Sequence, residues 1–167
     1  MRPCRYPVAA LLPHAPPMIL LDEVVSYDDE SLLAAVTITA SSLFLARDGV
    51  PGHVGIEYMA QACGAYAGVH ALDSGDPVRI GLLLGTRDYR VLAPWFRVGD
   101  HLRIAVALVF RDEPVAAFAC TITIDGKLVA DAQLKVYHSE DDQLRAAGGG
   151  KTQGIRAEGV KAQGIKE

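Results

Sequence analysis

The chain has 167 residues, of which 50% are hydrophobic and 22% are charged, and its formal net charge at pH 7 is −4. These values are typical of a single globular domain with a substantial core. A net negative charge without a basic stripe argues against a nucleic-acid-binding protein.

The cysteines and the N-terminal segment indicate a cytoplasmic protein. Cys4, Cys63 and Cys120 are widely separated, and no pair has the spacing of a disulfide framework or a metal site. Prolines interrupt the apolar N-terminal segment, which therefore does not match a signal peptide. No apolar stretch approaches the length of a membrane span. We expect a reduced, cytoplasmic setting.

Hydrophobic patterning predicts two strands, one long helix and four further strands, in that order. A single helical turn at 8–12, ended by Pro13, precedes them. The long helix is predicted at 53–72, and the pair Asp125-Gly126 marks a tight turn between the last two strands. The predicted strands cover residues 18–27, 32–39, 78–92, 101–111, 115–124 and 128–137.

The predicted helix has almost no polar face. Gly55, Gly64 and Gly68 lie within it, each at a cost of about 1 kcal/mol relative to Ala, which indicates close approach of other backbone. Small or apolar side chains on nearly every face predict a helix buried all round. A curved antiparallel sheet wrapped around this helix buries both elements, so we expect an α+β domain over 1–138. Residues 139–167 differ in composition and are expected to form a flexible tail.

Glu57 is the only formal charge between Val50 and Leu72. Placing an ionised carboxylate in a poorly hydrated site costs several kcal/mol, and a helix N-terminus returns only about 0.3–1 kcal/mol of this. The difference predicts that Glu57 lies in a cleft or at an interface, where it acts on a ligand. The alternative is a solvated first-turn glutamate that complements the helix dipole.

The segment PGHVGIE at 51–57 combines a tight turn with two groups that transfer protons. The turn exposes the first backbone N–H groups of the helix, that of Gly52 among them, and such groups bind a developing oxyanion. His53 and Glu57 are four residues apart and are expected on one helix face. This arrangement suits enolate formation next to a thioester, or thioester hydrolysis. The alternative for His53 is a side chain turned to solvent.

The other histidines carry weaker signals. His14 lies between prolines, where a rigid loop either presents it at a pocket mouth or uses it as a structural hydrogen-bonding group. His70, His101 and His138 have no partners by spacing and are expected to be structural or exposed. No serine-hydrolase, nucleotide-binding or zinc-protease motif is present, and we expect no metal and no cofactor.

Several stretches resemble the hotdog-fold 3-hydroxyacyl-[acyl-carrier-protein] dehydratases of fatty-acid synthesis. They are LLPHAPPMILLDEVV at 11–25, VPGHVGIEYMAQACG at 50–64, RVLAPWFRVGDHLRIAVAL at 90–108 and IDGKLVADAQLKVY at 124–137. The resemblance covers roughly residues 11–137. It implies a hotdog fold, in which a curved antiparallel sheet wraps around one long central helix. It also implies that Glu57 stands at the position of the family's catalytic acid.

One loop departs from the family. The family places its catalytic histidine in a Gly-His-Phe-Pro loop, whereas the loop from Ser41 to Val50 is shorter here and contains no histidine. This pattern is similar to divergent hotdog proteins of aryl-polyene-type pigment synthesis. In the family each site is shared across a dimer. Three accounts follow: His53 substitutes locally, a partner paralogue supplies the histidine, or the chemistry has changed to thioester hydrolysis.

The resemblance implies a dehydratase that acts on 3-hydroxyacyl thioesters of acyl carrier protein in fatty-acid or polyene-type biosynthesis. Acyl carrier protein or acyl-CoA would carry the substrate, and the chain would form a homodimer or a heterodimer with a hotdog paralogue. The alternatives are an acyl thioesterase that uses Glu57 as base or nucleophile, and a non-catalytic subunit of a heterodimeric dehydratase. The expected site consists of catalytic Glu57 and His53 with substrate-contacting Gly52, His14, Ala60 and Cys63.

Overall fold

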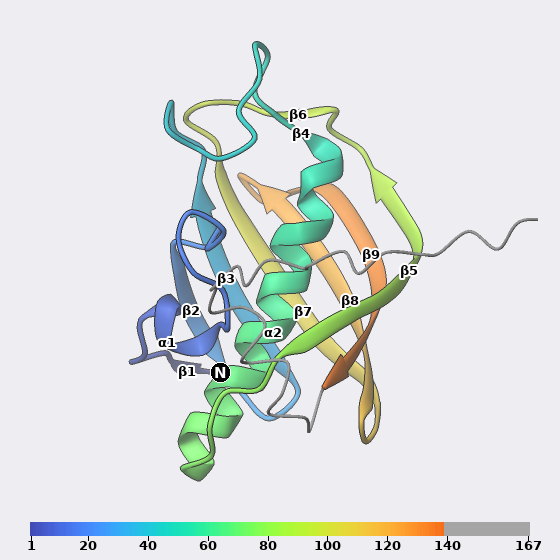
Figure 1. Cartoon of the computed structure of the whole chain (residues 1–167). Helices are drawn as coiled ribbons and strands as arrows, with labels where there is room; N and C mark the ends of the chain where they lie inside the picture. The colour runs from blue at the N-terminus through green and yellow to red at the C-terminus, as the bar shows by residue number, and fades with distance from the viewer. Residues whose placement is uncertain (139–167) are drawn as a thin grey trace, which may run out of the picture.

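Within residues 1–138, the part of the chain that the computed structural model describes, a seven-stranded antiparallel sheet curves around one long helix (Figure 1). The predicted tail, 139–167, lies outside the described residues. The α+β prediction is confirmed. In the order in which they lie side by side, the strands are β1 Arg2–Pro3, β2 Glu23–Tyr27, β3 Ser31–Thr37, β7 His101–Asp112, β8 Val115–Ile124, β9 Lys127–His138 and β5 Gly81–Val91.

The central helix α2, Gly55–Ser74, begins directly after a short 3-10 helix η1, Gly52–Val54. It ends at Gly75, whose φ of 77° lies in the left-handed region that glycine adopts readily. Side chains on most of its circumference are buried, which confirms the prediction of a helix enclosed nearly all round. No helix in this part of the chain is both long and apolar enough to cross a membrane.

The sheet packs against α2 through alternate residues of its strands. In β8, for example, Phe118, Cys120 and Ile122 are buried while their neighbours are less so. The same alternation in β7 buries Leu102 and Ile104. This period of two places one face of the curved sheet on the helix and leaves the other face outside.

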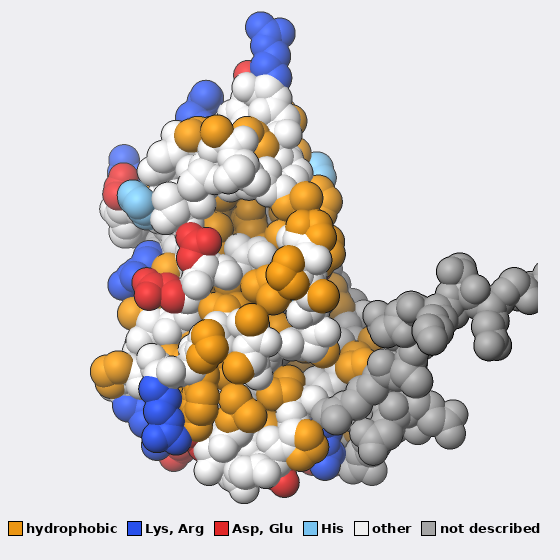
Figure 2. Space-filling view, turned by 60° about the vertical axis from the view of Figure 1, so that its left-hand side comes forward, with side chains coloured by type: hydrophobic (Ala, Val, Ile, Leu, Met, Phe, Trp, Pro, Cys, Tyr) orange, Lys and Arg blue, Asp and Glu red, His pale blue; other side chains and the backbone are white. Residues whose placement is uncertain are grey.

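Strand β5 forms one edge of the sheet and pairs only with β9 in the described structure. The sequence predicted a strand over 78–92, and the strand begins at Gly81. Nearly all of its residues are exposed, although several are large and apolar. In the right-hand half of the surface in Figure 2, hydrophobic side chains gather with few charged ones between them. The exposed hydrophobic residues of β5 and its end are Leu82, Leu83, Leu84, Val91 and Leu92.

Some short elements were not predicted. They are β1 and a two-stranded ribbon of β4, Val50–Pro51, and β6, Trp95–Phe96. Two residues are too few to show a hydrophobic period, and the ribbon pairs segments far apart in the sequence. The helical turn predicted at 8–12 is confirmed as α1, Val8–Leu11.

The helical glycines permit close contacts, and Gly68 is the clearest case. A methyl group at Gly68 would lie 2.2 Å from the backbone oxygen of Leu11, whereas one at Gly64 would lie 3.2 Å from the flexible Cδ2 of Leu12. Both alanine variants gain up to about 1 kcal/mol of helix propensity, so they form a matched pair.

We expect Gly68→Ala to lower the free energy of unfolding by about 1–3 kcal/mol, because it over-packs the contact between α1 and α2. Gly64→Ala is expected to leave the free energy of unfolding unchanged or to raise it slightly. Urea unfolding followed by circular dichroism measures both. Equal stability of the two variants would show that the backbone approach at Gly68 is not tight.

Candidate active site

A cavity of about 140 Å³ lies beside α2 where the side chain of Glu57 is half-buried. The helix residues along it span two turns, from Glu57 to Gly64, or about 10 Å at 1.5 Å per residue. The cavity is therefore elongated along the helix, with the carboxylate at one end. Its lining consists of Glu57, Ala60, Gln61 and Gly64 of α2, Gly81 and Leu83 of β5, Val136 and His138 of β9, and His14.

Gln61 connects the Glu57 carboxylate to the loop before β2. Its side chain is 1% exposed. Its Nε2 donates to Oε1 of Glu57 at 2.9 Å and to the carbonyl of Met18 at 2.7 Å, and its Oε1 accepts from the N–H of Leu20 at 2.8 Å. These bonds explain why β2 begins at Glu23 and not at the predicted residue 18: the backbone at 18–20 bonds to a helix side chain instead of a strand.

The site therefore includes a residue that sequence analysis did not assign. Gln61 lies one turn after Glu57, a spacing typical of contacting pairs on a helix. Buried polar side chains in proteins are nearly always hydrogen-bonded. A glutamine four residues after the lone carboxylate was the available signal, and its bonds to the distant loop had no counterpart in the sequence.

His14 lines the cavity. Of the two interpretations from the sequence, this position fits a loop that presents the side chain at a pocket mouth. Its Nδ1 is buried and has no hydrogen-bond partner among residues 1–138. A buried polar atom without a partner costs about 1–3 kcal/mol. This loop therefore holds an imidazole whose hydrogen-bonding capacity the described fold does not use.

His138 also lines the cavity, although the sequence indicated only a structural or exposed residue. It is paired with Gly81 across β9 and β5, two positions from the Leu83–Val136 pair. Burial lowers the pKa of His138, and the nearby Arg111 acts in the same direction, while Glu113 opposes both. The neutral imidazole is thus favoured. Only the pairing of β5 with β9 brings this residue to the helix, so no local motif predicted it.

His53 is not brought to the cavity. It lies in η1, where its side chain is exposed, and it does not line the cavity at Glu57. The expectation of a shared face assumed α-helical geometry from residue 53 onward. A 3-10 helix has 3.0 residues per turn instead of 3.6, so the four-residue spacing does not place the two side chains on one α-helical face.

The N–H of Gly52 already has a partner within the chain. It donates to the carbonyl of Pro94 at 2.8 Å, as part of the contact between β4 and β6. A side chain at Gly52 would lie 2.4 Å from the carbonyl oxygen of Ala93. The glycine is thus required by packing, and its N–H is occupied. The N–H groups of His53 and Val54 follow it at the start of η1, where helical N–H groups have no acceptor within the helix.

Ala60 and Cys63 lie on different sides of α2. Ala60 lines the cavity. Cys63 is fully buried, and its Sγ lies 3.7 Å from Sγ of Cys120 in β8. Burial raises the pKa of the Cys63 thiol, as does its contact with Cys120. Cys63 thus packs against the sheet and does not line the cavity.

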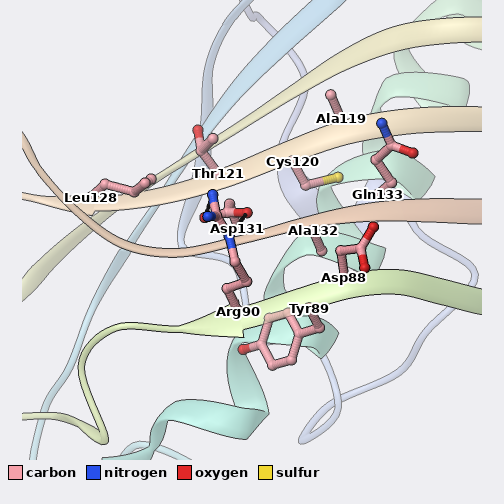
Figure 3. Close-up of a pocket in the computed structure, with 10 residues that line it drawn as sticks. All are labelled: Asp88, Tyr89, Arg90, Ala119, Cys120, Thr121, Leu128, Asp131, Ala132 and Gln133. Atoms are coloured by element: carbon pink, nitrogen blue, oxygen red, sulfur yellow. Dashed lines mark hydrogen bonds and ion pairs between the residues drawn. The ribbon is translucent and has the colours of Figure 1, made fainter.

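A larger hollow of about 670 Å³ lies over β8 and β9, beside β5 (Figure 3). Its central ion pair is already satisfied, because Arg90 donates from Nε and from its terminal nitrogen to the two oxygens of Asp131, both at 2.9 Å. Neither Glu57 nor a histidine lines it. No group of three or more metal-binding side chains was found among residues 1–138. We therefore place the candidate site at Glu57.

Comparison with known proteins identifies the family of the chain. Residues 6–147 match the family model of the ApeP-like dehydratases, described as ApeP dehydratase. A chain of the solved dehydratase heterocomplex ApeI:P from Xenorhabdus doucetiae is 32% identical and superposes with a TM-score of 0.80, over 88% of this chain and 100% of that one.

Curated relatives and further structures extend the comparison. The 3-hydroxyacyl-[acyl-carrier-protein] dehydratase FabZ of Agrobacterium fabrum is 30% identical over 133 residues, which cover 76% of this chain and 84% of that protein. A hypothetical thioesterase from Streptococcus pneumoniae is 18% identical over 70% of this chain and 84% of that one, with a TM-score of 0.56, and shares the fold. The chain belongs to the ApeP-like dehydratase family and adopts the hotdog fold that the sequence resemblance implied.

Proposed function

We propose that this protein removes water from 3-hydroxyacyl thioesters of acyl carrier protein, in fatty-acid or polyene-type biosynthesis. The observation that carries the proposal is the Glu57 carboxylate, held by Gln61 at the end of a cavity along the central helix. The FabZ relatives, named as 3-hydroxyacyl-[acyl-carrier-protein] dehydratases, support the substrate class. The expected cytoplasmic setting is part of the proposal, in line with the free thiols of Cys4, Cys63 and Cys120.

The reaction needs a base and an acid on either side of the C2–C3 bond. The base takes the proton at C2, the C2–C3 double bond forms, and the C3–O bond breaks. Glu57 donates a proton to the departing hydroxyl, which leaves as water, and a 2-enoyl thioester remains. Negative charge grows on the thioester oxygen during proton removal, where backbone N–H groups stabilise it. The N–H groups of His53 and Val54, one turn before Glu57, are the candidates.

We assign the base to a partner chain. The loop from Ser41 to Val50 has no histidine, and the exposed side chain of His53 lies outside the cavity. His14 and His138 line the cavity, and we assign them to contact with the acyl chain. The solved relative ApeI:P is a heterocomplex, which supports a paralogue as the source of the histidine.

The exposed edge of β5 is the proposed contact with that partner. An unpaired edge strand with a row of free backbone groups and apolar side chains is a template for pairing with another chain. Leu82, Leu83 and Leu84 are exposed there, and Leu83 also lines the cavity at Glu57. A partner on this edge therefore lies beside the carboxylate.

Replacing Glu57 tests the reaction itself. We expect Glu57→Gln to reduce dehydration by about 100-fold or more, because general acid catalysis contributes about that factor. The substrate is a 3-hydroxyacyl thioester of acyl carrier protein, the enzyme is this chain mixed with a hotdog paralogue that carries the loop histidine, and enoyl formation is followed by ultraviolet absorbance. Glu23→Gln, at an exposed position on β2, is the control and is expected to match the wild type.

The other outcomes of this experiment identify the alternatives. Thiol release without enoyl formation would replace the proposal with a thioesterase. Full activity of Glu57→Gln in the mixture would make this chain a non-catalytic subunit. A wild-type mixture that forms no enoyl product would overturn the proposal.

Gln61→Glu tests whether Gln61 positions and tunes the carboxylate. The substitution keeps the shape of the side chain and the oxygen that accepts from the N–H of Leu20. It places a second carboxylate where Nε2 now donates to Glu57 at 2.9 Å. Two neighbouring carboxylates raise the apparent pKa of the pair. We expect the alkaline limb of the pH profile of kcat, where the general acid loses its proton, to move to higher pH. A fall in activity with an unshifted profile would indicate a merely structural role.

Leu84→Asp tests the contact on β5. Leu84 is 57% exposed, and Val109 on β7, which serves as the control position, is 59% exposed. A charge buried in an interface costs several kcal/mol. We expect Leu84→Asp to abolish association with the paralogue in sedimentation velocity experiments, while Val109→Asp associates normally. Equal association of both variants would exclude the β5 edge as the contact.

A further inference from the structure

A β-bulge near the end of β5 turns one tyrosine toward the start of the central helix. Arg87 pairs with Gln133 and Arg90 with Asp131, so β5 advances by three residues where β9 advances by two. The extra residue is accommodated at Asp88, whose φ is +56°. Bulges commonly redirect a side chain in this way. In Figure 3, Asp88 and Arg90 reach toward β9, while the ring of Tyr89 extends from the other side of the strand, toward the helix.

The Tyr89 hydroxyl spans the 3-10 turn that precedes Glu57. It donates to the carbonyl of Gly52 at 2.6 Å, and it accepts a hydrogen bond from the backbone N–H of Ile56. One side chain thus bonds to the first residue of η1 and to the residue directly before Glu57. Burial raises the pKa of Tyr89 to about 12, against the opposing effect of the Ile56 N–H. The hydroxyl stays protonated at working pH and keeps both bonds.

The glycine at the beginning of α2 provides the space for this hydroxyl. A methyl group at Gly55 would lie 2.6 Å from the Tyr89 oxygen, closer than real contacts allow. The next atoms, Cδ1 of Ile122 and Cζ of Phe96, would lie 3.0 and 3.3 Å away. The bulge, the glycine and the tyrosine therefore form one arrangement, in which the Tyr89 hydroxyl of β5 reaches the start of the helix.

We propose that Tyr89 is a positioning residue for the reaction. It fixes the 3-10 turn so that the N–H groups of His53 and Val54 keep a constant relation to the Glu57 carboxylate. The proposal rests on the proposed function, which assigns the two N–H groups to the thioester oxygen and the Glu57 carboxyl group to the departing hydroxyl. Tyr89 does not line the cavity at Glu57, so it acts through the turn and not on the substrate.

Tyr89→Phe tests the proposal, with Tyr58→Phe as its matched control. Tyr58 follows Glu57 in α2, is 2% exposed and has a pKa also raised to about 12 by burial, and its hydroxyl has no hydrogen bond within the described residues. We expect Tyr89→Phe to lower kcat for dehydration in the complex by about tenfold, the scale of one hydrogen bond. KM is expected to change less than twofold, and Tyr58→Phe to match the wild type in both.

Amide hydrogen exchange gives a second readout that does not depend on activity. In Tyr89→Phe, the amides of 53–57 are expected to exchange at least about tenfold faster, because the turn opens locally, while the later turns of α2 are unchanged. If the wild-type complex proves inactive, the proposed function fails, and exchange still decides whether Tyr89 fixes the turn. Unchanged exchange, or faster exchange with wild-type kcat, would overturn the positioning role.

Gly55→Ala gives an independent test of the same contact. Its methyl group displaces the Tyr89 hydroxyl, so we expect the kcat and exchange effects of Tyr89→Phe to be reproduced. The double variant Gly55→Ala/Tyr89→Phe lacks the oxygen that the methyl group would meet. Its effects are expected to be close to those of Tyr89→Phe alone, whereas the effects of two independent substitutions would add. Additive losses in the double variant would contradict the shared contact.

Discussion

Enclosure of the central helix is the constraint on which this structure depends. A helix buried on nearly every side needs small residues where other backbone comes close, and Gly68 meets the backbone of Leu11 at such a point. The face formed by Glu57, Ala60 and Gly64 is only partly covered, and the cavity lies along it. A carboxylate on this face is neither in bulk water nor without partners. The packing of the fold thus creates the environment in which an acid can act on a ligand.

Gln61 gives that acid a defined position and also contributes to the fold. Its three hydrogen bonds join the helix, the carboxylate and the backbone at 18–20. A buried amide with all of these partners is stable, whereas the loss of any one leaves a buried group unsatisfied. The proposed site and the fold therefore depend on the same side chain. The loop that carries His14 is continuous with the backbone that Gln61 binds, so one network sets one wall of the cavity.

The start of the helix and the edge strand are linked in a similar manner. Strand β5 presents exposed leucines at the outer edge of the sheet, and through Tyr89 it contacts the turn before Glu57. A partner that pairs with this edge lies close to both the cavity and the turn. The loop from Ser41 to Val50 has no histidine. A similar chain is solved within a dehydratase heterocomplex, which supports the proposed division of base and acid between two chains.

The sequence by itself determined the order of the long elements and the enclosed helix, and it singled out Glu57 as the only formal charge between residues 50 and 72. These features follow from local patterns: alternation in strands, small residues in a helix and a single charge in an apolar segment. The short strands β1, β4 and β6 were missed because two residues show no period. Only the tertiary structure decided which groups surround the carboxylate. His138 reaches the cavity through the pairing of β9 with β5, and Gln61 through bonds to a loop more than forty residues earlier. His53 lies in the 3-10 turn that precedes the α-helix and does not line the cavity. Such contacts join residues far apart in the chain, or depend on the exact geometry of one turn, and neither is encoded in a local pattern of residue types.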